Sequence, residues 1–251
     1  MADKQRIFVL GPNRGIGFQL ASRLQVLGHT VYGTCRPQTR DDPSVAEVRL
    51  HFAGLRKGIK TFEVDATNES SINRAAEDFG DGPLDVLVNV AEVYQLWDEK
   101  LFTEQSAHDL MSYFQVNVVV RTKSPVRRSR LVYRVSDEGF PGIGIINISS
   151  DMASIEDNTG GNACYCISKA GVNQLTKTMS IDLIKFLDSR VKTLAVHPGY
   201  VATKMTGFCG EDDMDTCMSS LADTILRFRT PVGPELPNGE YVRWNGEKMA
   251  Y

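Results

Sequence analysis

Short apolar segments rich in β-branched residues alternate with longer amphipathic segments along most of the chain. The short segments fall at residues 7–10, 29–34, 61–64, 84–88, 143–148 and 191–196, and most are apolar at successive positions. Strands that are apolar on both faces are typical of a parallel sheet covered by helices. Residues 15–27 and 165–186 have apolar side chains at helical spacing. The alternation predicts an α/β fold with a doubly wound, mainly parallel sheet and helices on both faces.

The chain has 251 residues and no Pro- or Ser-rich break between its halves. One continuous α/β domain of this size is common. We therefore expect residues 1–251 to form a single domain with an integrated substrate pocket. Ligands of doubly wound sheets bind outside the carboxyl ends of the strands, so the chemistry is expected there.

The composition of the chain limits the classes of partner that it is expected to bind. The formal net charge of −3 argues against nucleic-acid binding, and we interpret the run Arg127, Arg128, Arg130 and Arg134 as a solvated helix face. No apolar stretch approaches the roughly 20 residues of a membrane span, and no leader precedes the first strand. The five cysteines are an odd count without metal-ligand spacing, so we expect free thiols, no metal site and a cytoplasmic location.

A glycine turn follows the first predicted strand. Gly11, Gly15 and Gly17 form a G-x-x-x-G-x-G pattern immediately before the first helix. Glycines at such a turn let backbone N–H groups and a helix amino terminus approach a pyrophosphate without an intervening side chain. A plain strand-to-helix turn is the alternative, but the position after the first strand of an alternating chain favours a dinucleotide.

The end of the second predicted strand indicates which dinucleotide. Sites specific for NAD place an acid there to bind the ribose 2′-hydroxyl, whereas this chain has Gly33-Thr34-Cys35-Arg36. Arg36, with Arg14 from the glycine turn, is suited to pair with a 2′-phosphate. We therefore predict NADPH, the alternative being that Arg36 is only a solvated loop charge.

The chemical signal is the segment Tyr165-Cys166-Ile167-Ser168-Lys169. Residues four apart share a helical face. A free tyrosine, with a pKa of about 10, is a poor base at neutral pH. A cation about 4 Å away is worth roughly 4 kcal/mol at an effective dielectric near 20, enough to make Tyr165 a usable acid or base.

Two further patterns bear on this interpretation. Ser149 and Ser150 end the predicted strand before Tyr165, where a hydroxyl can bind a carbonyl oxygen beside the phenol. A second match to the tyrosine–lysine spacing, Tyr200 and Lys204, follows Pro198-Gly199 in a predicted loop and has no such serine upstream. We interpret that second match as accidental.

The order of glycine turn, strand-end serine and Tyr-x-x-x-Lys resembles the short-chain dehydrogenase/reductase family over nearly the whole chain, and implies a single Rossmann-type domain. The resemblance implies a catalytic set of Asn117, Ser150, Tyr165 and Lys169, with Asn117 as the water-holding asparagine and Ser149 as the competing serine. It implies cofactor contacts from Gly11, Asn13, Arg14, Gly15, Ile16, Gly17, Arg36, Asp65, Asn89, Ala91, Tyr165, Lys169, Pro198, Gly199, Val201 and Thr203.

Within the family the chain is similar to the C-factor and sniffer-like carbonyl reductases, but it departs from the family pattern at three places. Leu10 stands where the family has threonine. Asn89-Val90-Ala91-Glu92 replaces Asn-Asn-Ala-Gly, and the Glu92 carboxylate is expected to crowd or repel an anionic dinucleotide. Residues 121–137 contain Pro125 and few apolar residues where the family has a dimer helix, which leaves a homo-oligomer in question.

Two functions follow. The first is an NADPH-dependent reductase of small aldehydes or ketones, or the reverse alcohol dehydrogenase, with Tyr165 as proton donor. The second is a family member without turnover that serves as a cofactor-binding signalling or scaffold protein, for which Glu92 is the main reason. The resemblance implies that residues 205–218 shape the substrate pocket, and their sequence does not specify the substrate.

Overall fold

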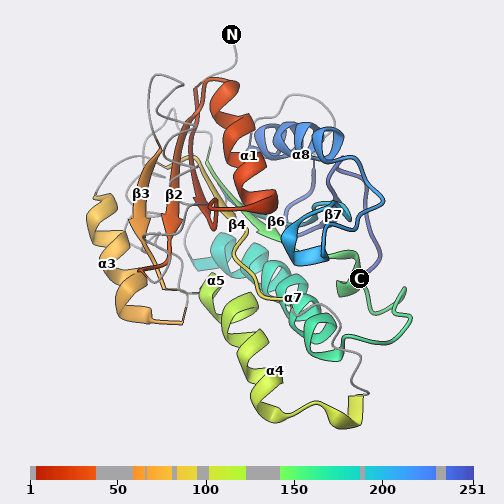
Figure 1. Cartoon of the computed structure of the whole chain (residues 1–251). Helices are drawn as coiled ribbons and strands as arrows, with labels where there is room; N and C mark the ends of the chain where they lie inside the picture. The colour runs from red at the N-terminus through yellow and green to blue at the C-terminus, as the bar shows by residue number, and fades with distance from the viewer. Residues whose placement is uncertain are drawn as a thin grey trace.

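A seven-stranded sheet organises the structure, a computed structural model that describes residues 4–37, 59–65, 67–80, 84–94, 102–122, 142–186, 190–229 and 236–251. The strand order is β3-β2-β1-β4-β5-β6-β7, and every neighbouring pair is parallel (Figure 1). The order reverses between β1 and β4, which is where such sheets bind ligands. The strands are β1 Arg6–Leu10, β2 Thr30–Cys35, β3 Lys60–Glu63, β4 Val86–Asn89, β5 Ile143–Ile148, β6 Val191–His197 and β7 Tyr241–Arg243.

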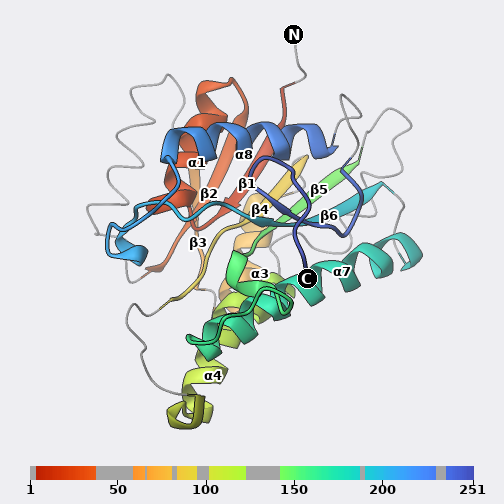
Figure 2. The same cartoon turned by 90° about the vertical axis from the view of Figure 1, so that its right-hand side faces the viewer.

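Helices cover both faces of this sheet (Figure 2). On one face lie α1 (Gly15–Val26) and α8 (Met214–Arg229), and on the other lie α3 (Glu69–Phe79), α5 (Val120–Thr122) and α7 (Ala163–Phe186). The helix α4 (Ala107–Phe114) packs against α7. The predicted doubly wound α/β fold is confirmed.

The strand β1 shows how the sequence builds two cores. Ile7 and Val9 pack into the cluster that contains residues of α1 and α8, whereas Phe8 and Leu10 pack into the cluster under α3 and α7. Successive residues of a strand point to opposite faces, so a strand buried on both sides must be apolar throughout. All four of these side chains are buried.

The helix ends differ in a way that matters for the site. Asn68 caps α3 by accepting from the backbone N–H groups of Ser70 and Ser71, and Ser106 with Asp109 forms a capping box on α4. The helix α1 instead begins after Arg14, whose side chain makes no cap, and it has no acid in its first turn. The first-turn N–H groups of α1 therefore keep their partial positive charge for a ligand.

Six of the seven strands were predicted to within about two residues at each end, and one of these six, β5, was predicted at its observed bounds. The short edge strand β7 was not predicted. The predicted helix at residues 15–27 ends one residue earlier, and the one at 165–186 begins two residues earlier, at Ala163. Of residues 121–137, which depart from the family pattern, the structure describes only Arg121 and Thr122. The arginine run that begins at Arg127 therefore lies outside the described residues.

Three features of the structure concern the cysteines, a membrane span and a metal site, on which the composition gave expectations. All five cysteines are free. Across the described ranges, no helix is both long and apolar enough to cross a bilayer. Within the same ranges, no group of three or more His, Cys, Asp or Glu side chains is placed to hold a metal ion.

Candidate active site

A crevice opens where β1 and β4 end, and the glycine turn forms its floor. Gly11 and Gly15 have φ angles of +91° and +54°, which favour glycine. A Cβ on Gly17 would lie 2.2 Å from the Gly11 carbonyl oxygen, so the turn closes only because residue 17 has no side chain. The crevice is lined by residues that include Gly11, Asn13, Arg14, Gly15, Ile16, Gly17, Thr34, Arg36, Asp65, Ala91, Glu92, Val93 and Thr203.

The two arginines expected to bind a 2′-phosphate lie on this crevice. Arg14 and Arg36 both line it, and both are exposed. Asp65 lines it too, with its carboxylate accepting hydrogen bonds from the backbone and the hydroxyl of Thr67. Thr34, which the sequence reasoning passed over, accepts from the Gly11 N–H at 3.1 Å and ties the glycine turn to β2. A glycine cradle, an uncapped helix terminus and two cations suit a phosphorylated dinucleotide.

Other residues that the resemblance assigned to the cofactor lie behind the crevice wall. Asn89 is 1% exposed, and its side-chain amide donates to Asn147 at 2.8 Å. Pro198 and Gly199 are buried, and a Cβ on Gly199 would lie 2.7 Å from the Cys217 sulfur. Val201 belongs to the core beside α8. In this structure these side chains support the wall.

The departures at Leu10 and Val90 are compatible with a braced wall. The backbone N–H groups of Val90 and Ala91 both donate to the Leu10 carbonyl, at 3.0 and 2.8 Å. Both apolar side chains are buried, Leu10 in the core under α3 and Val90 in the core under α1. Backbone hydrogen bonds and apolar packing therefore hold β1 and the segment after β4 together.

Ser150, Tyr165 and Lys169 converge beside this wall. Ser150 follows β5, whereas Tyr165 and Lys169 lie one turn apart on α7. The Ser150 side chain lies close enough to the Tyr165 hydroxyl to lower the pKa of that phenol. The Lys169 ammonium lies 5.4 Å from the centre of the Tyr165 ring. The structure thus brings together the serine, phenol and ammonium that the sequence singled out.

The two candidate serines point to different places. The Ser149 hydroxyl donates to the Asn173 side chain at 2.7 Å and is 2% exposed, so it anchors β5 to α7. The Ser150 hydroxyl lies beside the phenol and donates to Asp151 at 2.9 Å. Ser150 therefore has the position that carbonyl binding requires.

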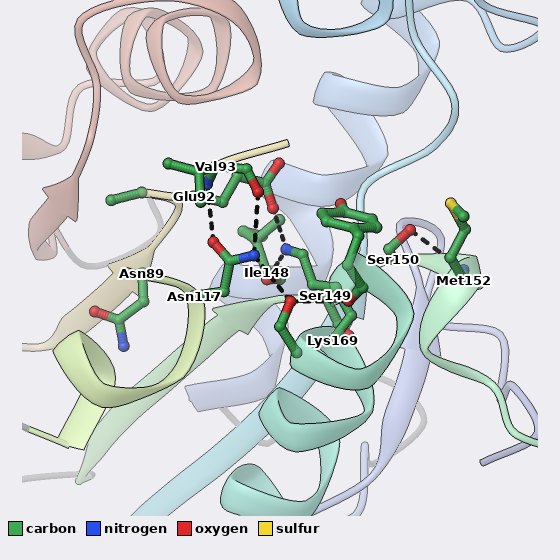
Figure 3. Close-up of polar contacts among 12 residues, drawn as sticks. Asn89, Glu92, Val93, Asn117, Ile148, Ser149, Ser150, Met152 and Lys169 are labelled. Atoms are coloured by element: carbon green, nitrogen blue, oxygen red, sulfur yellow. Dashed lines mark hydrogen bonds and ion pairs between the residues drawn. The ribbon is translucent and has the colours of Figure 1, made fainter. Parts of the chain in front are cut away.

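Lys169 has an unexpected partner. Its side chain is fully buried, and its ammonium donates to the Ile148 carbonyl at 3.1 Å and to the Glu92 carboxylate (Figure 3). Glu92, which the sequence suggested would crowd or repel a dinucleotide, is thus ion-paired, and it also lines the crevice. Its charge is directed at Lys169.

Asn117 lies in a π-helical turn, Gln115–Val119, between α4 and α5. Its side chain accepts from the Val93 N–H at 2.8 Å and donates to the Val93 carbonyl at 3.1 Å and to the Ser168 hydroxyl at 3.0 Å (Figure 3). The amide thus fixes the crevice wall against α7. The Asn117 carbonyl accepts from Arg121 at 2.5 Å.

Arg121 is the main residue that the sequence reasoning missed. It is 1% exposed, and its guanidinium donates to the carbonyls of Asn117, Asn89 and Ala91, the last at 3.5 Å. A signal was available, because Arg121 lies four residues after Asn117 and so on the same helical face. Its burial depends on carbonyls about thirty positions earlier in the chain, which no local pattern reveals.

Burial and charge pull the ionisable groups in different directions. Burial, reinforced by Glu92, raises the pKa of Tyr165 well above its usual value, while the neighbouring Ser150 side chain lowers it. Burial lowers the pKa of Lys169 to about 8, although Glu92 opposes that change. Burial lowers the pKa of Arg121 to about 10. The protein without cofactor therefore favours the protonated phenol.

Two tyrosines outside the predicted set complete the surroundings. Tyr94 packs its ring edge against Tyr165, with ring centres 4.7 Å apart. Tyr241, from β7, is fully buried and donates to the Ser150 carbonyl at 2.5 Å. In the second tyrosine–lysine match, Tyr200 is exposed in a loop, and Lys204 begins a three-residue 3-10 turn that lines the crevice.

Comparisons with known proteins identify the family of the chain. The chain belongs to the short chain dehydrogenase family, which matches residues 5–213. It is therefore a member of an oxidoreductase family. It is 28% identical over 229 residues to 5-keto-D-gluconate 5-reductase of Escherichia coli (strain K12), covering 90% of this chain and 84% of that protein. It is also 28% identical over 201 residues to L-xylulose reductase of Bos taurus, covering 80% and 73%.

Solved structures show the same fold. The carbonyl reductase Sniffer of D. melanogaster superposes with a TM-score of 0.82 at 27% identity, covering 99% of this chain and 100% of that chain. The NADPH-bound carbonyl reductase from chicken fatty liver has a TM-score of 0.82 at 23% identity, covering 99% of each chain.

Proposed function

We propose that this chain is an NADPH-dependent reductase that converts a small aldehyde or ketone to an alcohol. The observation that carries the proposal is the convergence of Ser150, Tyr165 and Lys169 beside a glycine-floored crevice at the point where strand order reverses. A bound reduced nicotinamide supplies a hydride to the carbonyl carbon. The residues described above would do the rest.

The chain's own groups manage the oxygen and the proton. Ser150 donates a hydrogen bond to the carbonyl oxygen, where negative charge develops as the carbon is reduced. Tyr165 transfers its phenolic proton to that oxygen, which gives the alcohol and leaves a phenolate. The Lys169 ammonium stabilises this phenolate. Asn117 and Tyr241 hold the surrounding backbone in place.

The choice of NADPH rests on Arg14 and Arg36 at the crevice. Backbone groups of the glycine turn would hold the pyrophosphate, and the two arginines the 2′-phosphate. Two solved structures of the same fold carry NADPH or NADP, namely the carbonyl reductase from chicken fatty liver and a short-chain dehydrogenase/reductase from Burkholderia multivorans. The five free thiols support our further proposal of a cytoplasmic location.

The named relatives suggest where to begin with substrates. Two reductases similar to this chain are named for 5-keto-D-gluconate and L-xylulose, both small polyhydroxylated ketones. We propose testing such ketones together with simple aldehydes. NADPH oxidation would be followed for each compound.

The decisive variant is Tyr165→Phe, with Tyr32→Phe as the matched control, since Tyr32 packs against Phe79 and is not among the residues that line the crevice. We expect Tyr165→Phe to bind NADPH like the wild type while turnover falls by about 10²–10⁴-fold. Tyr32→Phe should turn over normally. Wild-type turnover in Tyr165→Phe would exclude Tyr165 as the proton donor.

The scaffold alternative is favoured by one observation, the Glu92–Lys169 ion pair inside the crevice wall. Under that alternative the protein binds NADPH tightly, but no carbonyl compound produces NADPH oxidation that depends on Tyr165. The same assay therefore separates the two functions.

A further inference from the structure

The wall beside Tyr165 contains one acidic and one basic residue, Glu92 and Arg121, to which the proposed reaction assigns no role. Glu92 and Arg121 come from different segments, the loop after β4 and the helix α5. Arg121 is 1% exposed, and the Glu92 side chain is 11% exposed. Charged groups are rarely buried unless something compensates their charge. Their presence within one wall therefore needs an explanation.

Glu92 is the direct partner of the catalytic ammonium. Its carboxylate pairs with Lys169, whose other hydrogen bond goes to the Ile148 carbonyl at the end of β5 (Figure 3). A carboxylate in this position attracts the ammonium, but it also opposes negative charge on Tyr165. Taken alone, Glu92 would make the phenolate harder to form.

Arg121 offsets that disadvantage with a second positive charge in the same wall. In the described part of the chain, its three hydrogen bonds all go to backbone carbonyls, two of them at Asn89 and Ala91, directly before Glu92. The guanidinium therefore fixes the segment that carries Glu92. Its positive charge interacts favourably with both Glu92 and Tyr165.

We propose that Glu92 and Arg121 are an opposed pair of positioning residues that hold the net charge of the cluster they form with Lys169 at +1. Lys169 and Arg121 contribute two positive charges and Glu92 one negative charge. This net value equals that of a site with Lys169 alone. The inference concerns the site of the proposed function, and only its turnover experiment depends on that function.

Few other ionisable groups face this cluster. His197, at the end of β6, interacts weakly with Lys169. The phenol is also faced by Asp151 and Tyr94, whose negative forms oppose its ionisation. Glu92, Arg121, Asp151, Tyr94 and His197 thus act on Tyr165 or Lys169 in the described structure, and the Tyr113 ring also packs against Tyr165, with ring centres 6.4 Å apart.

The two residues should act in opposite directions. Glu92 raises the pKa of Lys169 and Arg121 lowers it. Glu92 also raises the pKa of Tyr165, whereas the Arg121 charge favours the phenolate. Removing either charge should therefore shift the pKa of both Tyr165 and Lys169. When both charges are removed, the two shifts should largely cancel. A pair that only held the backbone would not give shifts of opposite sign.

The test is a titration of Lys169 without cofactor. Lysines carry ¹³C at Cε, and the Lys169 resonance is identified by its absence in Lys169→Met. In the wild type the midpoint is expected at about 8. Glu92→Gln should lower this midpoint, Arg121→Met should raise it, and the double variant should return it toward the wild-type value.

Matched variants separate charge from shape. Glu92→Asp and Arg121→Lys keep the charges and should titrate nearer the wild type than the neutral variants do. Asp182→Asn removes an exposed carboxylate toward the far end of α7 and should leave the midpoint unchanged. If Arg121→Met fails to fold by circular dichroism, Arg121→Gln replaces it. An unchanged or higher midpoint in Glu92→Gln would overturn the proposal, as would shifts of the same sign in both neutral variants.

The turnover experiment asks whether the same charges set catalysis. Reduction needs the protonated phenol, so activity should be lost at high pH. Glu92→Gln should move this loss to lower pH, and Arg121→Met to higher pH. If the wild type shows no turnover, the proposed function fails while the lysine titration still decides whether the charge pair exists. If turnover is normal and Lys169 does not respond, the pair alone is wrong.

Discussion

At the scale of single residues, the proposed preference for NADPH rests on two arginine side chains that line the crevice. Arg36 is exposed there, and so is Arg14 of the glycine turn. A hydrogen bond to a charged group contributes about 1.5–3 kcal/mol, or about ten- to a hundredfold in affinity. We therefore expect Arg36→Glu to weaken NADPH binding by at least about tenfold while NADH binding changes little.

The measurement is a fluorescence titration with each nucleotide. Arg74→Glu is the control, because it makes the same change of charge at an exposed position of α3, away from the crevice. An equal loss of affinity for NADPH and NADH in Arg36→Glu would contradict the assignment of Arg36 to the 2′-phosphate.

Tyr241 gives a second prediction at this scale. Its hydroxyl donates to the buried Ser150 carbonyl, which also accepts from the Ala153 N–H at 3.0 Å. Tyr241→Phe should destabilise the protein by about 0.5–1.5 kcal/mol, since the carbonyl would lose one of these two donors. It should also lower turnover, because the backbone of Ser150 would be held less firmly. Urea unfolding and NADPH oxidation measure the two effects.

Tyr251→Phe is the matched control for Tyr241→Phe. The Tyr251 hydroxyl donates to the Gly239 carbonyl at 2.7 Å, a hydrogen bond of the same kind that does not involve Ser150. We expect a loss of stability without a change in turnover. Similar turnover in the two variants would show that Tyr241 has no role in positioning Ser150.

A contact in the site could be predicted from the sequence only where the residues that make it are close together in the chain. Tyr165 and Lys169 are one helical turn apart, so their pairing can be predicted from spacing. The Glu92–Lys169 pair joins positions 77 residues apart, and its formation depends on the order of β4 and β5 in the sheet. An arginine such as Arg121 ordinarily suggests a solvated residue, since burial is exceptional for it.

At the scale of elements, the turn between β1 and α1 determines whether the crevice exists. Gly17→Ala would place a methyl group against the Gly11 carbonyl, so the turn must shift. We expect a loss of about 1–3 kcal/mol of stability, typical of an overpacked site, and weaker NADPH binding. Calorimetry and a nucleotide titration test this.

Gly144→Ala is the control for Gly17→Ala. A Cβ on Gly144 would lie 3.6 Å from the Phe228 ring, an ordinary contact, and Gly144 is in the strand β5 away from the turn. NADPH binding should be unaffected. Unchanged nucleotide affinity in Gly17→Ala would mean that this turn does not contact the cofactor.

The elements themselves were predictable in proportion to their length and hydrophobicity. Strands β1, β4 and β5 are buried throughout or almost throughout, and their apolar runs mark them clearly. The strand β7 has only three residues, and such a segment has too few positions to show a period. It exists because β6 offers a free edge, with Ala195 opposite Tyr241. Tertiary contact, rather than local preference, creates it.

At the scale of the whole molecule, two buried histidines link stability to pH. Burial lowers the pKa of His29 and of His197. Each Nδ1 accepts a backbone hydrogen bond, from Gln5 at 3.1 Å and from Asp151 at 3.0 Å, which requires that nitrogen to be unprotonated. As pH falls below about 6.5, the unfolded chain binds protons first, so the free energy of unfolding decreases.

The expected result is a stability that is fully present above pH about 6.5 and declines below it. Replacing both His29 and His197 by asparagine should flatten this decline, although the variant is less stable at neutral pH. Urea unfolding between pH 5 and 8 gives the comparison. An equally steep decline in the double variant would assign the effect to other groups.

The opposed charges in the crevice wall have an evolutionary consequence. An ancestor that acquired the acid at position 92 alone would have gained a carboxylate facing its own phenol, and one that acquired the arginine at position 121 alone would have gained an uncompensated buried cation. Neither intermediate is favourable, so the two substitutions are expected to have become established together. Among descendants of the same ancestor, positions 92 and 121 should co-vary, with a glycine at the first accompanied by an uncharged residue at the second.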